Sequence, residues 1–376
     1  MNTMSKEKWE RVYYSEKSNK NNRNYLCRVF LLIASYAAYL LVTYDRIADM
    51  QELSIIQPQD ITESAPTSLQ LGEEYSAATY NIGFGAYTPE YSFFMDGGKS
   101  SWAASKESVL NTVEGASSLI AALDPDFALI QEIDLDATRS YHIDQYELLR
   151  KALPDYYSTF AVNYDSAFLA YPFTEPHGKS KSGLALFSRF PITGSMRRSF
   201  PISTSITKFF DLDRCYSVSR FPVENGKELV ILTLHMSAYG NSDEIREGQI
   251  LMLCEDMERE YFAGNYVICG GDFNHDLKAL ADDNMERESW AYPFPREKLP
   301  EHFEFCIDML CGEERAQLWN SARNADMEYV PDLTYTVTLD GFIISDNIKC
   351  TAYENISTGY CYSDHDPVLL RFQLLD

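Results

Sequence analysis

The stretch Cys269-Gly270-Gly271-Asp272-Phe273-Asn274 decides how the rest of the sequence is interpreted. It follows the apolar run Tyr266-Val267-Ile268, which is typical of a short buried strand. Asp272 and Asn274 stand two residues apart, so in an extended chain both side chains project to the same side of the strand end. A carboxylate there can accept a proton or bind a metal, and a carboxamide can contact a phosphate oxygen. A Gly-Gly-Asp turn also ends strands that have no chemical role, so other stretches must supply the partners of a site.

The composition indicates a packed globular protein with an unusual charge. The 376 residues suffice for one large α/β domain or two ordinary ones, and they are 45% hydrophobic and 14% aromatic. The net charge of −24 opposes nonspecific adhesion to nucleic acid or anionic lipid, because binders of such polyanions carry basic patches. A phosphate substrate stays compatible with this charge, since a bound cation reverses the local field. The eight cysteines contain no CxxC pair and predict no disulfide framework.

The N-terminus predicts a membrane anchor. Residues 1–24 carry an excess of Lys and Arg, and residues 25–44 are almost wholly apolar or small apart from Arg28. About 20 helical residues span the roughly 30 Å of a hydrocarbon core. Basic residues before the segment and acidic ones after it predict a cytoplasmic tail, a single transmembrane helix and a remainder outside the cell. No small-x-small cleavage site follows, which favours an uncleaved anchor over a signal peptide. A buried helix of the globular part is the structural alternative.

Residues 45–75 are polar, contain Pro58 and Pro66, and predict a linker. After them, segments with strand and helix patterns alternate. The expected strands are 76–82, 127–130, 183–187, 215–221, 229–234, 266–268, 334–338, 341–344 and 368–372. The expected helices are 105–123, 137–152 and 243–262. Residues 276–332 are less regular and could be an insertion that shapes access to a site.

Polar side chains recur at or beside the ends of these expected strands. Each alone has an ordinary structural interpretation, as a loop-facing acid or a structural histidine. Together they describe an enzyme assembled at one rim of a β-sandwich: Asn81, Glu132, His235, Asp272 with Asn274, Asp340, and Asp364 with His365. Five aromatic residues between Phe84 and Phe94 form a further cluster, which could face lipid or simply pack.

Seven motifs in order carry a resemblance to a known family. They are TYNIG (79–83), ALIQEID (128–134), GLALFSRFPI (183–192), LTLHMSA (232–238), GGDFNHD (270–276), LDGFIISD (339–346) and SDHDPVLLRF (363–372). From Ala77 to Phe372 the chain resembles the endonuclease/exonuclease/phosphatase superfamily, which includes DNases, abasic-site endonucleases, inositol polyphosphate 5-phosphatases and neutral sphingomyelinases. The resemblance implies an α/β protein, a four-layer α/β/β/α sandwich of the DNase-like type. The N-terminal transmembrane helix precedes this catalytic domain, residues 76–376.

The resemblance also implies roles for single residues. It implies that Mg²⁺ or Mn²⁺ is held by Asn81, Glu132 and Asp364. It implies that Asp272 and Asn274 orient water and the scissile phosphate, and that His365, paired with Asp340, is the essential histidine. His235 matches a second histidine of the DNase and sphingomyelinase branches. Abasic-site endonucleases carry an acid where this chain has Gly83, which argues against a dedicated repair role.

The chemistry that follows is hydrolysis of a phosphoester by in-line attack of water, with charge neutralisation and protonation of the leaving group. The first hypothesis is a nuclease or related phosphodiesterase. The second is a sphingomyelinase-like or phosphoinositide-directed enzyme acting on a phospholipid head group, with the bilayer contacted through the N-terminal helix. The third, from another class, is a non-catalytic binding module on the same scaffold.

Overall fold

The computed structural model describes residues 6–43, 47–59, 66–202, 213–238, 243–279 and 291–376. The chain divides into two compact units, Met1–Asp45 and Arg46–Asp376. Each unit is described by itself.

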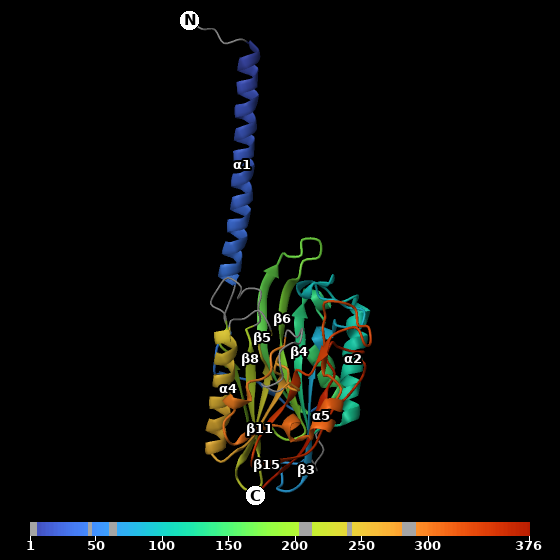
Figure 1. The fold of residues 1–376 in the computed structure, drawn as a ribbon. Coiled ribbons are helices and arrows are strands. Elements are labelled where there is room, and N and C mark those ends of the chain that lie inside the picture. Colours follow the sequence, from blue (N-terminus) through green and yellow to red (C-terminus); the bar gives the residue numbers. More distant parts are fainter. Residues whose placement is uncertain (1–5, 44–46, 60–65, 203–212, 239–242, 280–290) are drawn as a thin grey trace. The chain divides into compact units, whose positions relative to one another are not determined.

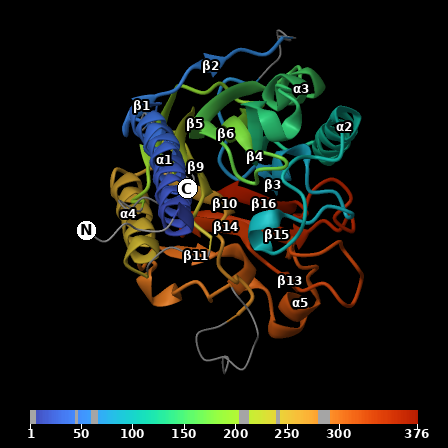
Figure 2. The ribbon, with the colours of Figure 1, turned by 90° about the horizontal axis from the view of Figure 1, so that it is seen from above.

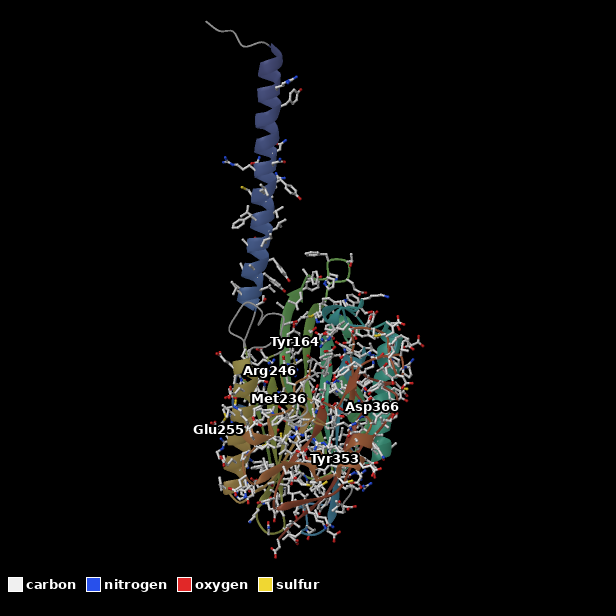
Figure 3. The ribbon with its side chains drawn as sticks, viewed as in Figure 1. Tyr164, Met236, Arg246, Glu255, Tyr353 and Asp366 are labelled. Carbon is white, nitrogen blue, oxygen red and sulfur yellow. The ribbon has the colours of Figure 1, made fainter. Side chains whose placement is uncertain are left out.

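The first unit consists of one long helix, α1 (Lys6–Thr43). Its part from Asn21 to Thr43 is long and apolar enough to cross a membrane. Large apolar side chains such as Phe30 and Leu32 are about 71% exposed, and Figure 3 shows the side chains of α1 standing away from the helix. The expected segment 25–44 is therefore helical to Thr43 and lacks the polar surface of an ordinary solvent-exposed helix.

Two seven-stranded sheets form the centre of the second unit (Figures 1 and 2). In spatial order, the first sheet contains β15 (Ile348–Asn355), β16 (Val368–Leu374), β3 (Glu74–Asn81), β4 (Phe127–Ala137), β6 (Gly178–Ser188), β5 (Tyr157–Leu169) and β2 (Ile55–Ile56). The second contains β1 (Gln51–Glu52), β7 (Gly194–Ser199), β8 (Cys215–Pro222), β9 (Glu228–His235), β10 (Tyr266–Asp272), β14 (Asp340–Ser345) and β11 (Phe303–Phe305).

Helices cover the outer faces of both sheets (Figure 2). Helices α2 (Lys106–Leu123) and α3 (Gln145–Ala152) pack on the first sheet through buried residues such as Ile120 and Leu149. Helix α4 (Asp243–Phe262) packs on the second sheet through Leu253 and Met257. In Figure 3 Glu255 lies on the outward side of α4, while Met236 lies inside. The four-layer α/β/β/α sandwich expected from the sequence is confirmed.

Each sheet contains one parallel crossover unit, and this arrangement positions the strand ends. Strands β3 and β4 pair in parallel with α2 between them in sequence, and β9 and β10 pair in parallel with α4 between them. The cap residues of α2 explain its limits. The Ser105 side chain accepts the Ser108 N–H at its start, and Asp124 adopts a left-handed conformation at its end. In both crossovers, polar side chains follow the carboxyl ends of the two parallel strands.

Shorter elements complete the unit. They are the 3₁₀ turns η1 (Gly83–Gly85), η2 (Phe94–Asp96), η3 (Thr138–Ser140), η5 (Arg296–Lys298) and η6 (Cys306–Met309), the helix α5 (Gly312–Gln317), and a two-stranded sheet of β12 (Ala322–Arg323) and β13 (Thr336–Val337). Several of these elements lie within 276–332, so that irregular region is mostly ordered where the structure describes it.

Three expectations about secondary structure differ from what the structure shows. The expected helix 137–152 begins only at Gln145, because β4 continues to Ala137 and pairs with Ser180 of β6. Strands β5, β7 and β15 were not expected, because their polar residues obscure the alternation of buried and exposed positions. Residues 45–75 were expected to be a linker, yet β1 and β2 extend the edges of both sheets, and Leu69 is buried in the core.

Candidate active site

The carboxyl end of β10 brings three polar residues of the second sheet together. In the strand register, Asp272 lies opposite His235 of β9 and opposite Asp340 of β14. Residues directly opposite one another project their side chains to the same face. Gly271 makes this close pairing possible. It has a φ of 146°, and a Cβ there would lie 2.1 Å from the Leu234 carbonyl oxygen.

The first sheet presents its polar residues at the same rim. Asn81 ends β3 opposite Gln131 of β4, and Glu132 follows directly. Glu132 adopts a left-handed conformation with a φ of 57°, where the pairing of β4 with β6 is interrupted between Ile130 and Ile133. A bulge of this kind redirects a side chain. A non-glycine residue held in this conformation costs about 1–3 kcal/mol and is a feature of functional sites.

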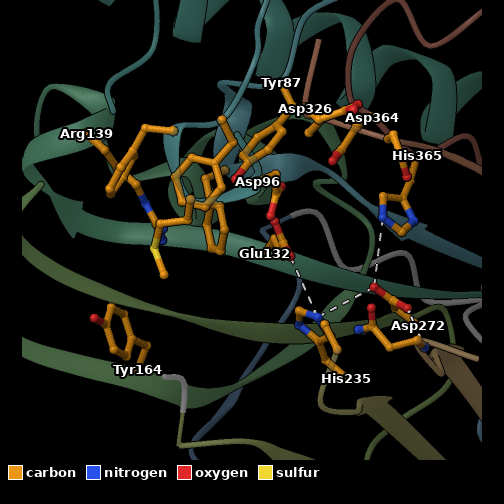
Figure 4. Close-up of a pocket in the computed structure, with 18 of the residues that line it drawn as sticks. Tyr87, Asp96, Glu132, Arg139, Tyr164, His235, Asp272, Asp326, Asp364 and His365 are labelled. Atoms are coloured by element: carbon orange, nitrogen blue, oxygen red, sulfur yellow. Dashed lines mark hydrogen bonds and ion pairs between the residues drawn. The ribbon is translucent and has the colours of Figure 1, made fainter. Parts of the chain in front are cut away.

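Contacts across the two sheets join these ends into one site (Figure 4). Asn81 Nδ2 donates a hydrogen bond of 3.1 Å to Asp272 Oδ2. His235 Nε2 lies 3.6 Å from Glu132 Oε1 and 3.5 Å from Asp272 Oδ2. Asp272 is therefore the point at which the polar groups of both sheets meet.

A hydrogen-bonded pair of His365 and Asp340 forms the second part of the site. His365 Nδ1 lies 2.8 Å from Asp340 Oδ2, and His365 Nε2 lies 3.9 Å from Asp272 Oδ2. Burial alone would lower the pKa of His365, but the Asp340 carboxylate raises it well above 6.5. The imidazolium form of His365 is therefore favoured at neutral pH, and Asp340 fixes the orientation of its ring.

Ser321, which the sequence did not single out, holds Asp340 in place. Its Oγ donates to Asp340 Oδ2 at 2.7 Å and accepts the backbone N–H of Asp340 at 3.1 Å. Ser321 lies in the irregular region, where no motif marks a single serine. Only the folded structure brings it to the start of β14.

Two carboxylates stand close together on the other side of the site. A Cβ on Gly83 would lie 3.0 Å from Asp364 Oδ1, so there is no room for the acidic side chain of the abasic-site pattern. Burial, followed by the charge of Asp364, raises the pKa of Glu132 to about 8. Burial also raises the pKa of Asp272 to about 6, and Asp340 adds to this effect. These carboxylates repel one another when all are charged.

Several buried polar atoms are left for a further binding partner. Among the described residues, His235 Nδ1 and Asp340 Oδ1 have no hydrogen-bond partner. An unpaired buried polar atom costs about 1–3 kcal/mol and requires an explanation. Burial lowers the pKa of His235 well below 6.5, with Arg214 and His365 contributing, so its ring is neutral.

The donor set fits a hard divalent cation. Ligand atoms of Asp272, Asp340 and His365 lie within 4.8 Å of one another, and the carboxylates of Glu132 and Asp364 lie across the same cavity. Asp340 and His365 already bond to each other, and the Glu132 side of the cavity offers further carboxylate oxygens that could hold a cation. Carboxylate and carboxamide oxygens are ligands that Mg²⁺ and Mn²⁺ prefer.

A cavity of about 620 Å³ opens over these groups. Six of the eight residues proposed from the sequence line it: Glu132, His235, Asp272, Asn274, Asp364 and His365. Asn81 and Asp340 support it through hydrogen bonds to Asp272 and His365. Asn274 is itself held by bonds from its N–H to Asp272 Oδ1 and from its Nδ2 to the Met236 carbonyl oxygen. The structure thus brings all eight residues together.

The cavity also contains residues that sequence reasoning missed. They include Arg139, Tyr164, Tyr171, Arg214, Arg323, Asn324 and Asp326. They come from η3, the β5–β6 hairpin, β12 and loops, and their spacing in sequence carries no sign of a shared cavity. Of the aromatic cluster noted in the sequence, Phe84, Tyr87, Phe93 and Phe94 line the cavity, and Tyr91 is buried in a satellite core beside it.

Two sheets packed face to face, with acids and histidines at one rim, define a sandwich of the DNase-like class. Residues 78–308 match the sequence profile of the Endonuclease/Exonuclease/phosphatase family. The chain belongs to that family.

Solved structures share this fold at low sequence identity. An endonuclease/exonuclease/phosphatase from Beutenbergia cavernae aligns with a TM-score of 0.54 and 15% identity over 80% of this chain and 72% of its own. A protein of the same description from Bacteroides vulgatus aligns with a TM-score of 0.52 and 16% identity, over 80% of this chain and 99% of its own. TDP2 of D. rerio, solved with a single-strand DNA product, aligns with a TM-score of 0.53 and 15% identity, over 80% of this chain and 99% of its own. A comparison with curated protein sequences finds no match.

Proposed function

We propose that this protein is a divalent-metal-dependent phosphodiesterase that hydrolyses a P–O bond by in-line attack of water. The observation that carries the proposal is the arrangement around Asp272. That carboxylate lies next to the neutral His235 and the cationic His365, and His235 in turn contacts Glu132, the acid we assign to the metal. A water nucleophile, a phosphoryl group and a leaving oxygen each have a suitable partner there.

Three residues would hold Mg²⁺ or Mn²⁺: Glu132 and Asp364 through carboxylate oxygens, and Asn81 through its carboxamide oxygen. When bound, the cation neutralises the charge that develops on the phosphoryl oxygens. Asn81 Oδ1 accepts the Gly83 N–H at 3.0 Å, and this bond fixes the carboxamide beside Asp272. A bound cation would therefore offset the repulsion between the carboxylates of Glu132 and Asp364.

Asp272 would accept a proton from the attacking water or orient it. Its pKa of about 6 leaves it charged at neutral pH but still basic enough for this role. The imidazolium of His365 would stabilise the negative charge of the pentavalent phosphorus, with Asp340 holding the ring. Asn274 and His235 would orient the phosphoryl oxygens and the leaving oxygen.

The overall reaction takes one water and one phosphodiester to a phosphomonoester and an alcohol. The oxygen of water bonds to phosphorus, the P–O bond to the leaving alcohol breaks, and one proton passes to that alcohol oxygen. The nucleic-acid substrate favoured by the sequence is supported by the family, and the TDP2 structure contains a single-strand DNA product. A phospholipid head group is the second candidate, supported by the apolar helix Asn21–Thr43.

We further propose the topology expected from the sequence, with residues 1–24 in the cytoplasm, the apolar segment 25–44 in the bilayer and residues 46–376 outside. The excess of Lys and Arg before the apolar segment supports this orientation. Protease treatment of intact cells should digest the large unit. Its protection until the cells are lysed would contradict the exterior placement.

The test of the proposed function is a substrate panel run with Mg²⁺ in H₂¹⁸O. Purified protein in detergent is incubated with DNA, RNA, sphingomyelin vesicles and phosphoinositide vesicles. We expect Mg²⁺-dependent hydrolysis with ¹⁸O in the phosphorylated product. Label in the alcohol product would refute attack at phosphorus. Turnover of lipid without cleavage of nucleic acid would replace the first substrate class by the second.

A further inference from the structure

On one side of the second unit the two sheets end in the edge strands β15 and β11. An edge strand pairs on one side only, so other parts of the chain must cover its free side. The turn η6 follows β11 directly and packs against both β14 and β15. This turn therefore joins the edges of the two sheets through side-chain contacts.

One cysteine from each of the two edges lies at this contact. Cys306, at the start of η6, is fully buried in the main core cluster, and Cys350 of β15 packs against the same cluster. In β15 the side chain of Ile348 is buried, and because strand side chains alternate, Cys350 projects to the same inner face. A bulge between Cys350 and Ala352 then shifts the alternation, so that Tyr353 is the next buried side chain. The local structure thus directs Cys350 toward η6.

The two side chains are close enough for a hydrogen bond between their thiols. This contact lowers the pKa of Cys350, whose side chain is partly exposed. Burial, followed by the Cys350 thiol, raises the pKa of Cys306 well above its usual value. Cys350 is therefore the more accessible and more readily ionised of the two. Both residues are free thiols in this structure.

We propose that Cys306 and Cys350 form a disulfide bond when the second unit lies outside the cell, and that this bond fastens the edges of the two sheets to each other. Neighbouring thiols persist in a reducing compartment, whereas disulfides form and persist in an oxidising one. The bond goes beyond the proposed reaction and does not depend on its substrate. The proposed exterior placement supplies only the oxidising environment.

The oxidation is a thiol–disulfide exchange with a small disulfide such as oxidised glutathione. The Cys350 thiolate attacks one sulfur of oxidised glutathione, forms a mixed disulfide and releases one glutathione. The Cys306 thiolate then attacks the Cys350 sulfur, forms the internal disulfide and releases the second glutathione. Two protein thiols are oxidised, one disulfide is reduced, and the two protons end on the two glutathione thiols.

The bond would close a loop of about 45 residues and constrain it in the unfolded chain, which stabilises the folded state. That loop includes Ser321, which holds Asp340, and also Arg323 and Asn324, which line the cavity. The bond would therefore secure the irregular region that forms one wall of the candidate site, without contact to the reacting groups.

The first test determines the state of the thiols in cells that make the protein. Cells are quenched in acid, and the protein is denatured with N-ethylmaleimide, then reduced and labelled with a heavier maleimide. We expect mass spectrometry to find only the second label on Cys306 and Cys350, and the linked peptide in the unreduced sample. The exposed Cys311 and Cys361 should carry the first label. The first label on Cys306 and Cys350 in most chains would overturn the proposal.

The second test measures what the bond contributes to stability. Full-length protein in detergent is equilibrated with oxidised glutathione, and its Tm is measured before and after reduction with dithiothreitol. We expect reduction to lower the Tm by roughly 5 °C or more. Cys350→Ser should abolish this difference. Cys311→Ser is the matched control, because it removes an exposed thiol of the same segment, and it should keep the difference.

A wild-type Tm that reduction leaves unchanged, or a difference that persists in Cys350→Ser, would overturn the proposal. Each comparison is made within one variant, so a lower overall stability of Cys350→Ser does not affect the result. Neither test uses hydrolysis of a diester, so failure of the disulfide and failure of the proposed function are distinguishable.

Discussion

Glu132 combines a strained backbone, a buried carboxylate and a place at the junction of two sheets. Its sequence context, ALIQEID, predicts a strand that ends in an acid but not the left-handed turn that directs the side chain. That turn depends on the interrupted pairing with β6, which lies about 50 residues further along the chain. The identity of the residue could be predicted from sequence, whereas its orientation could not.

The raised pKa of Glu132 predicts how the metal-free protein responds to pH. Because the folded-state pKa is about 8 instead of 4.5, the fold favours the protonated acid. The free energy of unfolding should therefore fall as pH rises from about 4.5 to 8. Glu132→Gln should raise the Tm of the metal-free protein by roughly 2–5 °C at pH 8 and leave it nearly unchanged at pH 4.5. Differential scanning calorimetry with EDTA measures both.

The same variant tests metal binding without an activity assay. Mg²⁺ should raise the Tm of the wild-type protein at pH 8, and this increase should be lost in Glu132→Gln. Glu90→Gln, which removes an exposed carboxylate, should keep the full increase. An equal response to Mg²⁺ in Glu132→Gln would show that the cation binds elsewhere.

The contact with Asp340 determines the charge state of His365. Since Asp340 raises the folded-state pKa of His365 well above 6.5, its stabilising contribution is complete below pH 6.5 and is lost as pH rises through the folded-state value. Asp340→Asn should lower the pKa of His365 markedly and reduce kcat by about 100-fold or more. A histidine-labelled NMR titration gives the pKa directly. An unchanged value in the variant would contradict the role of this pair.

At the scale of elements, β10 shows why two glycines precede Asp272. A side chain at Gly270 would collide with Phe342 and Leu129, and one at Gly271 would collide with the backbone of Leu234. The sequence predicts the strand and the flexibility of its end. The contacts that require glycine come from β9, β14 and the opposite sheet, so they are visible only in the packed structure.

Gly271→Ala should therefore disrupt the site more than the addition of one methyl group would suggest. With a φ of 146° and a backbone oxygen 2.1 Å from the new Cβ, neither the strand pairing nor Asp272 can stay in place. We expect the free energy of unfolding to fall by about 3 kcal/mol or more. Gly194→Ala in β7 is the control, since the nearest atom to its Cβ would be 3.9 Å away and the change should cost under about 1 kcal/mol. Chemical denaturation of both variants measures the difference, and similar losses would contradict the steric account.

The strands missed from sequence share one physical property. Strands β5 and β15 mix polar with apolar residues, so their strand pattern is weak until pairing partners are known. The parallel units were easier to predict, because buried runs such as 127–130 and 229–234 are continuous and apolar. Most residues of the site follow strands of these parallel units, which explains why they were found although several other strands, β5 and β15 among them, were missed.

At the scale of the whole molecule, the segment 45–75 belongs in part to the folded unit. Strand β1 pairs with β7, β2 pairs with β5, and Leu69 is fully buried. Residues 46–376 should therefore fold as a soluble protein, whereas residues 74–376 should have a Tm lower by roughly 5 °C or more, because both sheet edges and a core residue are lost. Thermal denaturation of the two fragments measures this, and equal Tm values would restore the linker interpretation.

The candidate site and the apolar helix lie in different units of the chain, so catalysis and membrane attachment can be tested separately. All residues of the candidate site lie in the unit Arg46–Asp376, and the apolar helix lies in the unit Met1–Asp45. Residues 46–376 should keep kcat on soluble diesters and lose sedimentation with membranes. A fragment that still sediments would indicate that a surface of the large unit binds lipid.

The central claim is that the rim where both sheets meet is a metal-dependent phosphodiesterase site. Its most direct test is the Mg²⁺-dependent release of p-nitrophenolate from p-nitrophenyl diesters by the wild type, Glu132→Gln and Glu90→Gln. We expect hydrolysis by the wild type and Glu90→Gln that EDTA abolishes, and a loss of about 1,000-fold or more in Glu132→Gln. Full activity of Glu132→Gln, or no hydrolysis of any diester by the wild type with Mg²⁺, would contradict the claim.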